Sequence, residues 1–394
     1  MKQLDGLVAV PSLAEPRFME AHHLATEVGL LPNKNRMVRT IDTGGAGPVS
    51  GLLEAVRMIR VEQCETVAVV AADAVSALPT AEFLRRADAT CRPSPSGDAG
   101  SGQAQATSLL PNSSASSLSS STPQQTSNYL PSPVIPHGYD RVAQWQMRTY
   151  GVTRAQLAAV SVLMSHQASH HPLALTKQAH TLEQVLSSPK IAPVTSLLEC
   201  ARRADGGAAV VVSSSAFMQR HGLLESHPGV VVVGGGECSG PLFPPANIDE
   251  DMFSCEEAAR LAYTQAQLAP RDIDWWGLYD CFPICFIRAV EAVGLAPKGS
   301  GGMWVEEQCA KILAAGNEGR STAGLIPINT HGGLLAFGAP WETPAMYNVI
   351  EGVEQIRGRA VARQVKGVRR ALVYGNGGIF SHSSVAILAK PVDY

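Results

Sequence analysis

The stretch Ile41-Asp42-Thr43-Gly44-Gly45-Ala46-Gly47-Pro48 decides the fold, because a stretch far downstream repeats its pattern. The second copy is Ile328-Asn329-Thr330-His331-Gly332-Gly333. In both copies a glycine-rich turn leads through a proline into a predicted helix. Backbone N–H groups at such a turn attract negative charge, so each copy suits an anion or a developing oxyanion. Neither turn carries a cysteine, a serine or another activated nucleophile.

Each copy is followed by the same order of elements. After the first copy, apolar residues at helical spacing predict a helix over residues 48–60, and an apolar run predicts a buried strand over 66–72. After the second copy, Thr343 is the predicted N-cap of a helix, and a strand is predicted over 371–374. The chain therefore contains one helix–strand unit twice.

A third pair of matching segments supports this repeat. Asp205-Gly206-Gly207 precedes the apolar run that ends at Val212, and Asn376-Gly377-Gly378 precedes the one over residues 384–388. Helices that alternate with near-continuous apolar strands indicate sheets that are covered on both faces. We therefore predict an α/β protein made of two similar halves.

An insertion of different composition interrupts the first half. Residues 1–80 and 205–222 are assigned to the first half, residues 81–204 to the insertion and residues 223–394 to the second half. Within the insertion, residues 95–128 are rich in Ser, Pro, Gln and Thr and almost free of charge. Such a stretch buries too little apolar surface to offset the entropy of ordering it. We expect it to be disordered.

Composition and charge narrow the class of protein. The 394 residues are 45% hydrophobic and 16% charged, which is typical of a compact α/β protein. The formal net charge of −3 and the lack of a basic run argue against a nucleic-acid partner. The eight cysteines form no C-x-x-C pair, so we expect free thiols and no zinc site. His166, His170 and His171 have helical spacing but no acidic or cysteine companion, which favours a packed or solvated face over a metal site.

Nothing in the sequence directs the chain to a membrane or to export. No apolar run is long enough to span a bilayer, and the N-terminus lacks the pattern of a signal peptide. The C-terminal Val392-Asp393-Tyr394 is not a peroxisomal signal of the Ser-Lys-Leu type. A cytoplasmic protein is the simplest expectation, with a peroxisomal or mitochondrial location as the alternative.

Several motifs, taken together and in order, resemble those of the thiolase superfamily. Tyr279-Asp280-Cys281-Phe282 is similar to the family's His-Asp-Cys-Phe, and Asn329-Thr330-His331-Gly332-Gly333 is similar to Asn-Pro-Ser-Gly-Gly. The other matching motifs are His171-Pro172-Leu173-Ala174, Asp205-Gly206-Gly207-Ala208-Ala209 and Glu354-Gln355-Ile356-Arg357-Gly358. Within the superfamily the chain resembles the sterol-carrier-protein type, also called lipid-transfer thiolases. The match covers nearly all of the chain except the Ser-rich segment.

The resemblance implies a five-layered α-β-α-β-α fold, with two halves related by a pseudo-twofold axis and a loop domain inserted in the first. Active members of the family use a nucleophilic cysteine, a histidine in Gly-His-Pro and a second cysteine in Cys-x-Gly. In this sequence those positions fall on Gly45, Ala339 and Gly375. Glycine and alanine can neither form a thioester nor carry a proton, so thiolysis through an acyl-enzyme is not expected. The family also begins with a strand and a helix ahead of Leu4. We expect the sequence to be incomplete at its start, with a first half that lacks one unit of its sheet as the alternative.

Tyr279, Cys281 and His331 are the predicted catalytic residues. Tyr279 stands where the family has a histidine, and a phenol can donate a hydrogen bond to a developing oxyanion. In the steroid-aldolase branch that the chain also resembles, tyrosines take over the lost roles. Cys281 matches a family cysteine that assists proton transfer, with a small packed residue as the alternative. His331 is predicted to contact the thioester carbonyl, with a structural turn residue as the alternative, and Asp280 is predicted to be the N-cap of the helix that runs to Val293.

The predicted substrate is an acyl thioester of coenzyme A, and coenzyme A is expected only as part of that substrate, with no bound cofactor and no metal. The residues predicted to hold the substrate are Gly45, Gly332, Gly333, Asn376 and Gly377. The resemblance implies acyltransferase or retro-aldol chemistry in lipid or sterol metabolism without a covalent cysteine intermediate. It further implies a homodimer that can pair with a small partner subunit. The alternative is a non-enzymatic acyl-CoA-binding, lipid-binding or scaffold subunit.

Overall fold

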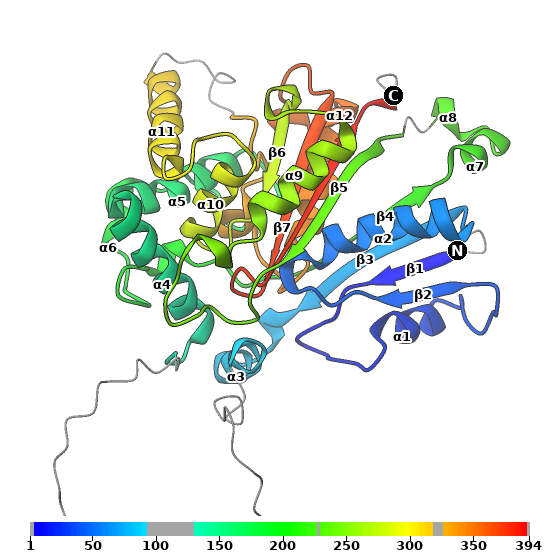
Figure 1. Ribbon diagram of the computed structural model, residues 1–394, viewed down its shortest axis with the longest axis horizontal. Coiled ribbons are helices and arrows are strands. Elements are labelled where there is room, and N and C mark those ends of the chain that lie inside the picture. Colours follow the sequence, from blue (N-terminus) through cyan, green and yellow to red (C-terminus); the bar gives the residue numbers. More distant parts are fainter. Residues whose placement is uncertain (1–3, 93–129, 227–228, 318–325, 392–394) are drawn as a thin grey trace, which may run out of the picture.

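Two four-stranded sheets organise the molecule, as the computed structural model in Figure 1 shows. The structure describes residues 4–92, 130–226, 229–317 and 326–391. The Ser-rich segment 95–128, which was predicted to be disordered, lies outside the described residues.

The first sheet has the strand order β2-β1-β3-β4. Strand β1 pairs in parallel with β2 and β3, and β4 runs antiparallel to β3 over nine residue pairs from Thr66↔Ser213 to Ala74↔Asp205. This ladder confirms the strand predicted over 66–72. The strands of this sheet are β1 (Gly6–Ala9), β2 (Met37–Thr40), β3 (Thr66–Ala74) and β4 (Asp205–Ser213).

The second sheet has the order β5-β8-β7-β6. Strand β7 is parallel to β6 and antiparallel to β8, and β5 is antiparallel to β8. Strand β8 is therefore flanked on both sides, whereas β4, which holds the same place in the first sheet, is an edge strand among the described residues. The strands of this sheet are β5 (Val231–Ser239), β6 (Trp275–Leu278), β7 (Arg370–Gly377) and β8 (His382–Ala389).

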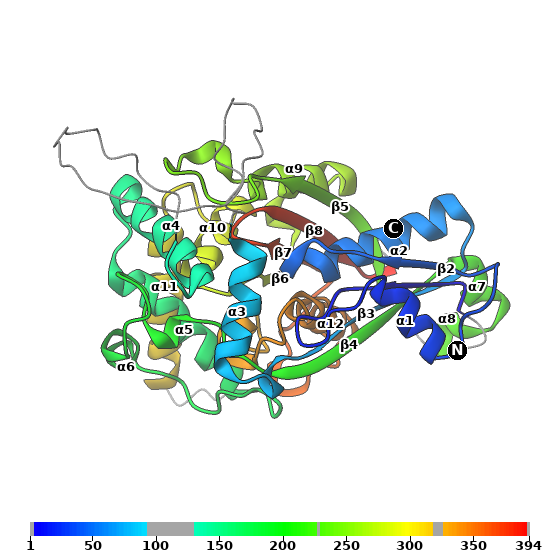
Figure 2. The ribbon, with the colours of Figure 1, turned by 90° about the horizontal axis from the view of Figure 1, so that it is seen from below.

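Helices α2 (Gly47–Glu62) and α12 (Pro344–Arg357) form the layer between the two sheets (Figure 2). Helix α2 contacts β3 and β8, and α12 contacts β4 and β7. Helix α1 (Glu20–Glu27) covers the outer face of the first sheet, and α9 (Cys255–Ala266) covers the outer face of the second. The layering is thus α-β-α-β-α, which confirms the predicted fold.

The amphipathic pattern of α2 explains its central place. Val49, Leu52, Ala55 and Met58 are buried on the helix and belong to the main core, which also includes side chains of both sheets. A helix that packs against a sheet on each side must be apolar around more of its circumference than a surface helix. The predicted helix over 48–60 is confirmed.

The remaining helices are α3 (Thr80–Cys91), α4 (Val134–Tyr150), α5 (Arg154–Ser169), α6 (Leu182–Ser187), α7 (Ser215–Arg220), α8 (Leu223–Ser226), α10 (Pro283–Ala292) and α11 (Gly301–Asn317). Of these, α4, α5, α6, α10 and α11 lie together to the left of the second sheet in Figure 1, whereas α7 and α8 lie at the right, beyond the end of β4. Helix α4 contacts α3 and α10, so the insertion packs against the second half. Among the helices of the described ranges, none is both long enough and apolar enough to cross a membrane.

One capping prediction is only partly right. Thr343 is the N-cap position of α12, but its backbone is already helical and its side chain makes no capping hydrogen bond. An N-cap side chain accepts from the backbone of the first turn only when the capping residue itself is extended. Pro344 at the first helical position removes one of the N–H groups that would otherwise need a partner.

Candidate active site

The first glycine-rich turn and the segment 375–378, which ends β7 and follows it, meet backbone to backbone at the junction of the halves. The first turn is a short 3-10 helix, Gly44–Ala46, and it contacts the end of β7. A Cβ atom on Gly377 would lie 1.9 Å from the carbonyl oxygen of Thr43, and one on Gly375 would lie 2.9 Å from the Cα of Ala46. Only glycine permits this approach, so the backbone of each half forms one wall of the same site.

Tyr279 fills the space in front of Gly45. A Cβ atom on Gly45 would lie 2.0 Å from the phenol oxygen of Tyr279 and 2.6 Å from the carbonyl oxygen of Asn376. Tyr279 is 5% exposed and follows directly after β6. The structure therefore brings Gly45, Tyr279 and Asn376 together, and the phenol occupies the volume that a side chain at position 45 would need.

A second tyrosine, Tyr139 on α4, belongs to the same site. Its hydroxyl donates to the carbonyl oxygen of Gly378 at 2.6 Å and accepts from Nδ2 of Asn376 at 2.7 Å. Its ring stacks on Phe282 with centroids 4.7 Å apart. Nothing in the sequence around Tyr139 marked it, because a single aromatic residue in an apolar helix is usually a core residue.

Both phenols are hydrogen-bond donors at neutral pH. Burial, and next the charge of Cys281, raise the pKa of Tyr139 and of Tyr279 well above the usual value of a tyrosine. The pKa of Cys285 is likewise raised, first by burial and then by Cys281. Cys281 is partly buried and lies two residues ahead of Pro283, the first residue of α10. Tyr139 and the two predicted residues Tyr279 and Cys281 therefore lie in the same buried part of the site, where the charge of Cys281 affects the pKa of both phenols.

Asp280 does not cap the helix that follows it, contrary to the prediction. The N-cap of α10 is Phe282. Asp280 instead turns to the second glycine-rich region, where its carboxylate accepts from the backbone N–H groups of Leu334 at 2.8 Å and Leu335 at 3.3 Å. These residues lie in a π-helical turn, Gly333–Phe337, whose first N–H groups have no partner within the turn. A fully buried carboxylate satisfies them across the fold, which spacing along the chain could not show.

This contact explains Gly333. Its φ of +61° lies in the left-handed region, and a Cβ atom there would lie 2.2 Å from Oδ2 of Asp280. Burial raises the pKa of Asp280 to about 7, although the hydrogen bonds from Leu334 and Leu335 act in the opposite direction.

Asp280 should make the stability of the protein depend on pH. Its pKa is about 7 in the folded protein against 3.8 for an unperturbed aspartate, so the folded state binds this proton more tightly. The stabilisation is complete below the lower value and is lost as pH rises through about 7, at up to about 1.4 kcal/mol per pH unit. Urea unfolding of wild type and Asp280→Asn across this range should show a difference that shrinks toward pH 7. A constant difference would mean that the carboxyl titrates normally.

The structure places His331 in a different cluster from Tyr279. His331 is 3% exposed, and its ring lies edge-on to Phe337 with centroids 5.3 Å apart. Burial lowers the pKa of His331 to about 4, and the charges that act on it are those of Glu351, His171 and Arg363. Gly332 and Gly333 lead from His331 into the π-helical turn. His331 is thus a neutral imidazole whose Nδ1 is buried without a partner among the described residues.

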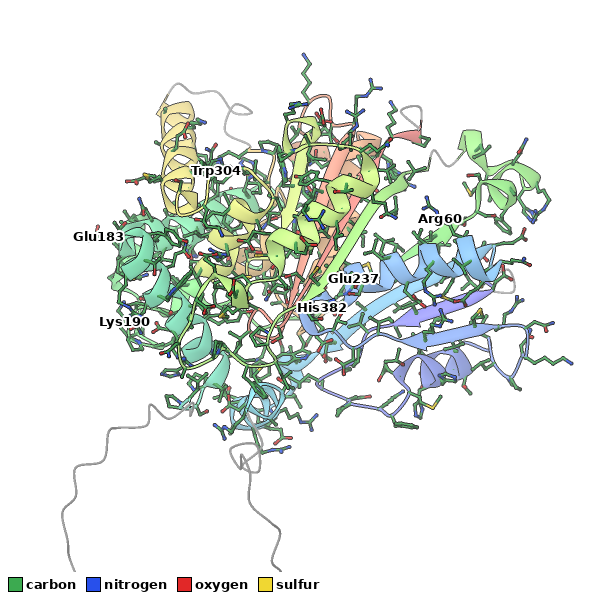
Figure 3. All side chains as sticks on the ribbon, viewed as in Figure 1. Arg60, Glu183, Lys190, Glu237, Trp304 and His382 are labelled. Atoms are coloured by element: carbon green, nitrogen blue, oxygen red, sulfur yellow. The ribbon has the colours of Figure 1, made fainter. Side chains whose placement is uncertain are left out.

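A chain of polar side chains ties the first glycine-rich turn to the second sheet. Thr43 donates to Ser50 at 3.1 Å, and Ser50 and Ser384 share a hydrogen bond of 2.8 Å. Ser384 donates to Glu237 at 2.8 Å, and Glu237 lies beside His382 on the neighbouring strand (Figure 3). Burial would raise the pKa of Glu237, but hydrogen bonds from His382, Ser50 and Ser384 lower it to about 2. This chain fixes α2, and with it the turn, against β8.

The described residues offer no metal site, since they hold no group of three or more His, Cys, Asp or Glu side chains that could bind an ion. All eight cysteines are free thiols. The groups that the described part of the site offers for chemistry are its backbone N–H groups, the phenols of Tyr139 and Tyr279, the thiols and the nearby carboxyls.

Comparison with known proteins identifies the family. Residues 247–390 match the family model described as "Thiolase C-terminal domain-like". The chain is 34% identical over 257 residues to an acetyl-CoA acetyltransferase of Methanothermobacter thermautotrophicus, covering 65% of this chain and 63% of that protein. It is 30% identical over 255 residues to sterol carrier protein 2 of Bos taurus, covering 63% of this chain and 44% of that protein.

These similarities support a protein of the thiolase superfamily, as the motifs predicted. The similarity to sterol carrier protein 2 supports the sterol-carrier-protein type within it. The chain spans less than two thirds of the length of these curated relatives.

Solved structures of thiolases share the fold over nearly the whole chain. The Ltp2-ChsH2(DUF35) aldolase superposes with a TM-score of 0.68 at 20% identity, covering 99% of this chain and 87% of that one. A monomeric SCP2-thiolase like protein type 1 from Mycobacterium smegmatis superposes with a TM-score of 0.66 at 17% identity, covering 98% of this chain and 68% of that one. At these identities the likeness supports the fold and says nothing of activity.

Proposed function

We propose that this thiolase-like protein binds an acyl thioester of coenzyme A and makes or breaks a carbon–carbon bond next to the thioester without a covalent acyl-enzyme. The observation that carries the proposal is the contact between Gly45 and Tyr279. The backbone around Gly45 and Gly377 can still stabilise an oxyanion. The protonated phenol of Tyr279 occupies the space that the side chain of a nucleophile at position 45 would need. Such a site can stabilise an enolate oxygen and cannot be acylated at position 45.

The roles of the site residues follow from their surroundings. Tyr279, held protonated by burial, is the hydrogen-bond donor toward the developing charge on a thioester oxygen. Tyr139 is also held protonated, and its hydroxyl donates to Gly378 and accepts from Asn376, so it positions the backbone wall of the site. Cys281 is placed to exchange protons with the two phenols. Backbone N–H groups near Gly45 and Gly377 complete the site for the oxyanion. His331, with a pKa of about 4, acts as a neutral hydrogen-bonding group at the second glycine-rich region and not as a cation.

A basic pocket supports coenzyme A as the carrier. It has a volume of about 380 Å³, lies on α4, the helix that carries Tyr139, and is lined in part by Arg141, Trp145 and Arg148. The Arg141 guanidinium donates to the carbonyl oxygens of Pro245 and Ala246, and burial lowers its pKa. Two guanidinium groups beside an indole ring suit the phosphates and the base of a nucleotide.

The relatives named above make this assignment more specific. One is an acetyl-CoA acetyltransferase, and the Ltp2 structure is an aldolase whose name couples it with a DUF35 protein. We extend the proposal to a small partner subunit, in keeping with that name. A homodimer and a cytoplasmic location are further parts of the proposal that rest on the family resemblance alone.

The decisive experiment separates binding, turnover and covalent chemistry. The protein is titrated with coenzyme A by calorimetry and incubated with radiolabelled acetyl-CoA, after which it is denatured and counted. We expect binding, and no label on the denatured protein. A stable label mapped to Cys281 would contradict the non-covalent route. Binding without turnover of any acyl-CoA would instead favour a non-enzymatic acyl-CoA-binding or scaffold subunit.

A further inference from the structure

Glu342 is a titratable group beside the candidate site that the proposed function leaves without a role. It lies between the Gly338-Ala339-Pro340 turn and the start of α12. Glu342 as a whole is partly exposed, but its Oε2 atom is buried and has no hydrogen-bond partner among the described residues. A buried carboxyl oxygen without a partner is costly, and groups of this kind concentrate at functional sites.

The turn that carries Glu342 is held from two sides. The N–H of Ala339 donates to the carbonyl oxygen of Arg202 at 2.8 Å, which fixes the turn to the approach of β4. Trp341 has a φ of +48°, a left-handed conformation that is strained for a bulky residue. Its ring lies edge-on against Phe83 of α3, with centroids 5.9 Å apart. The packing of Trp341 against α3 thus maintains its strained backbone conformation, and this conformation determines the direction in which the chain continues to Glu342.

Glu342 shares an electrostatic environment with the phenol of the site. Burial, and next the charge of Asp42, raise the pKa of Glu342 to about 8, with a further contribution from Asp73 and an opposing hydrogen bond from Trp341. In turn, the charge of Glu342 raises the pKa of Tyr279. Glu342 lies two residues ahead of α12, and this helix contacts the first glycine-rich turn, so the residue lies near the junction where the two halves meet.

The other groups packed around this turn do not neutralise Glu342. The thiol of Cys91, at the end of α3, has a raised pKa to which burial contributes most and the charges of Glu342 and Cys281 contribute further. Arg203 lies over the ring of Phe83 at 4.9 Å, and its Nη1 has no hydrogen-bond partner in the described part of the chain. No described cation forms an ion pair with Glu342, so no fixed positive charge holds this carboxyl in its ionised form.

We propose that Glu342 is the general base of this site and that the substrate is a β-hydroxyacyl thioester of coenzyme A. This inference rests on the proposed function. In cleavage, the Glu342 carboxylate takes the proton of the β-hydroxyl group, and the electron pair of that O–H bond forms the carbonyl of the released aldehyde or ketone. The pair of the broken carbon–carbon bond becomes the thioester enolate. The enolate carbon takes a proton from Tyr279, and Glu342 returns its proton to the tyrosinate. Condensation is the reverse.

The first part of the test needs no ligand. The unfolding free energy of wild type, Glu342→Gln and the surface control Glu307→Gln is measured by urea titration across the neutral range. The pKa of Glu342 is about 8 when folded against 4.5 for an unperturbed glutamate, so its contribution is complete at low pH and is lost as pH rises through about 8. We expect the difference between wild type and Glu342→Gln to shrink over that range, and Glu307→Gln to follow wild type throughout. Parallel curves for wild type and Glu342→Gln would overturn the proposal.

The second part follows turnover of β-hydroxybutyryl-CoA against pH. Because the base acts ionised, wild-type cleavage should rise with pH through about 8 and level off above it, and Glu342→Gln should lose about 10²-fold or more in rate together with this pH dependence. Asp42→Asn removes a charge that raises the pKa of Glu342, so the rise should move to lower pH.

The outcomes separate this inference from the function on which it rests. Unchanged turnover in Glu342→Gln, with turnover still lost in Tyr279→Phe, would overturn the role of Glu342 and leave the site intact. If wild type turns over another acyl-CoA but cleaves no β-hydroxyacyl-CoA, the inference fails and the proposed function stands, whereas no turnover of any acyl-CoA overturns both. A loss of rate in Glu342→Gln without any change in the shape of the pH profile would also overturn the proposal, because a packing defect lowers the rate at every pH.

Discussion

Tyr279→Phe should lower the turnover of an acyl-CoA substrate by about 10²–10³-fold, the usual effect of removing one donor from an oxyanion hole. The change removes a single hydroxyl and keeps the ring. Tyr279 is 5% exposed and sits against the backbone at Gly45 and Asn376, so the ring should hold its position and the protein should fold. The loss should appear mainly in kcat, because the hydrogen bond strengthens as charge develops on the oxygen.

The measurement is steady-state kinetics with calorimetric coenzyme A binding on the same preparations. Tyr347→Phe is the matched control, since that phenol is also partly buried but lies against Phe337, away from Gly45. We expect Tyr347→Phe to retain wild-type turnover and coenzyme A affinity. If Tyr279→Phe leaves both turnover and affinity unchanged, Tyr279 is only a core residue and the proposed site is wrong.

Gly45→Ala should destabilise the protein by about 1–3 kcal/mol, the usual cost of adding an atom to a filled interior. The new Cβ would lie 2.0 Å from the phenol oxygen of Tyr279 and 2.6 Å from the carbonyl oxygen of Asn376. The Asn376 carbonyl belongs to the backbone of β7, so it cannot move away without displacing the second sheet. Urea unfolding measures the effect. The control is Gly229→Ala, where a Cβ would meet nothing within 4 Å. A neutral Gly45→Ala would show that Tyr279 yields easily and that the space is open to ligand.

This contact also decides how thiolase chemistry could be restored. The sequence alone favours Gly45→Cys combined with Ala339→His, because those positions correspond to the family nucleophile and its base. The structure shows that the phenol of Tyr279 occupies the space that the new thiol needs. We therefore expect the double variant to be destabilised and unable to accept an acyl group, and we expect any transfer to require Tyr279→His as well. Mass spectrometry after incubation with acetyl-CoA distinguishes the two variants.

The sequence by itself determined the duplicated architecture. The helices α2 and α12 and the strands β3, β4, β7 and β8 lie where apolar periodicity and the glycine pairs placed them. This succeeded because burial between covered layers imposes a strong and local pattern on the chain. The motifs around Tyr279 and Gly333 likewise identified the family, since matching residues in a fixed order carry more information than any one of them.

The sequence was less informative about which residues face one another. Asp280 looked like a cap for the helix beside it, yet it binds the backbone of Leu334 and Leu335, more than fifty positions along the chain. Tyr139 and Glu342 carried no local signal at all. Tertiary structure alone decided that Tyr279 fills the space before Gly45, and that Glu342, just ahead of α12, has a buried carboxyl oxygen without a hydrogen-bond partner among the described residues. The physical reason is that secondary structure follows from patterns along the chain, whereas an active site is made by the approach of segments that belong to different layers, and burial there sets both the contacts and the protonation of each group.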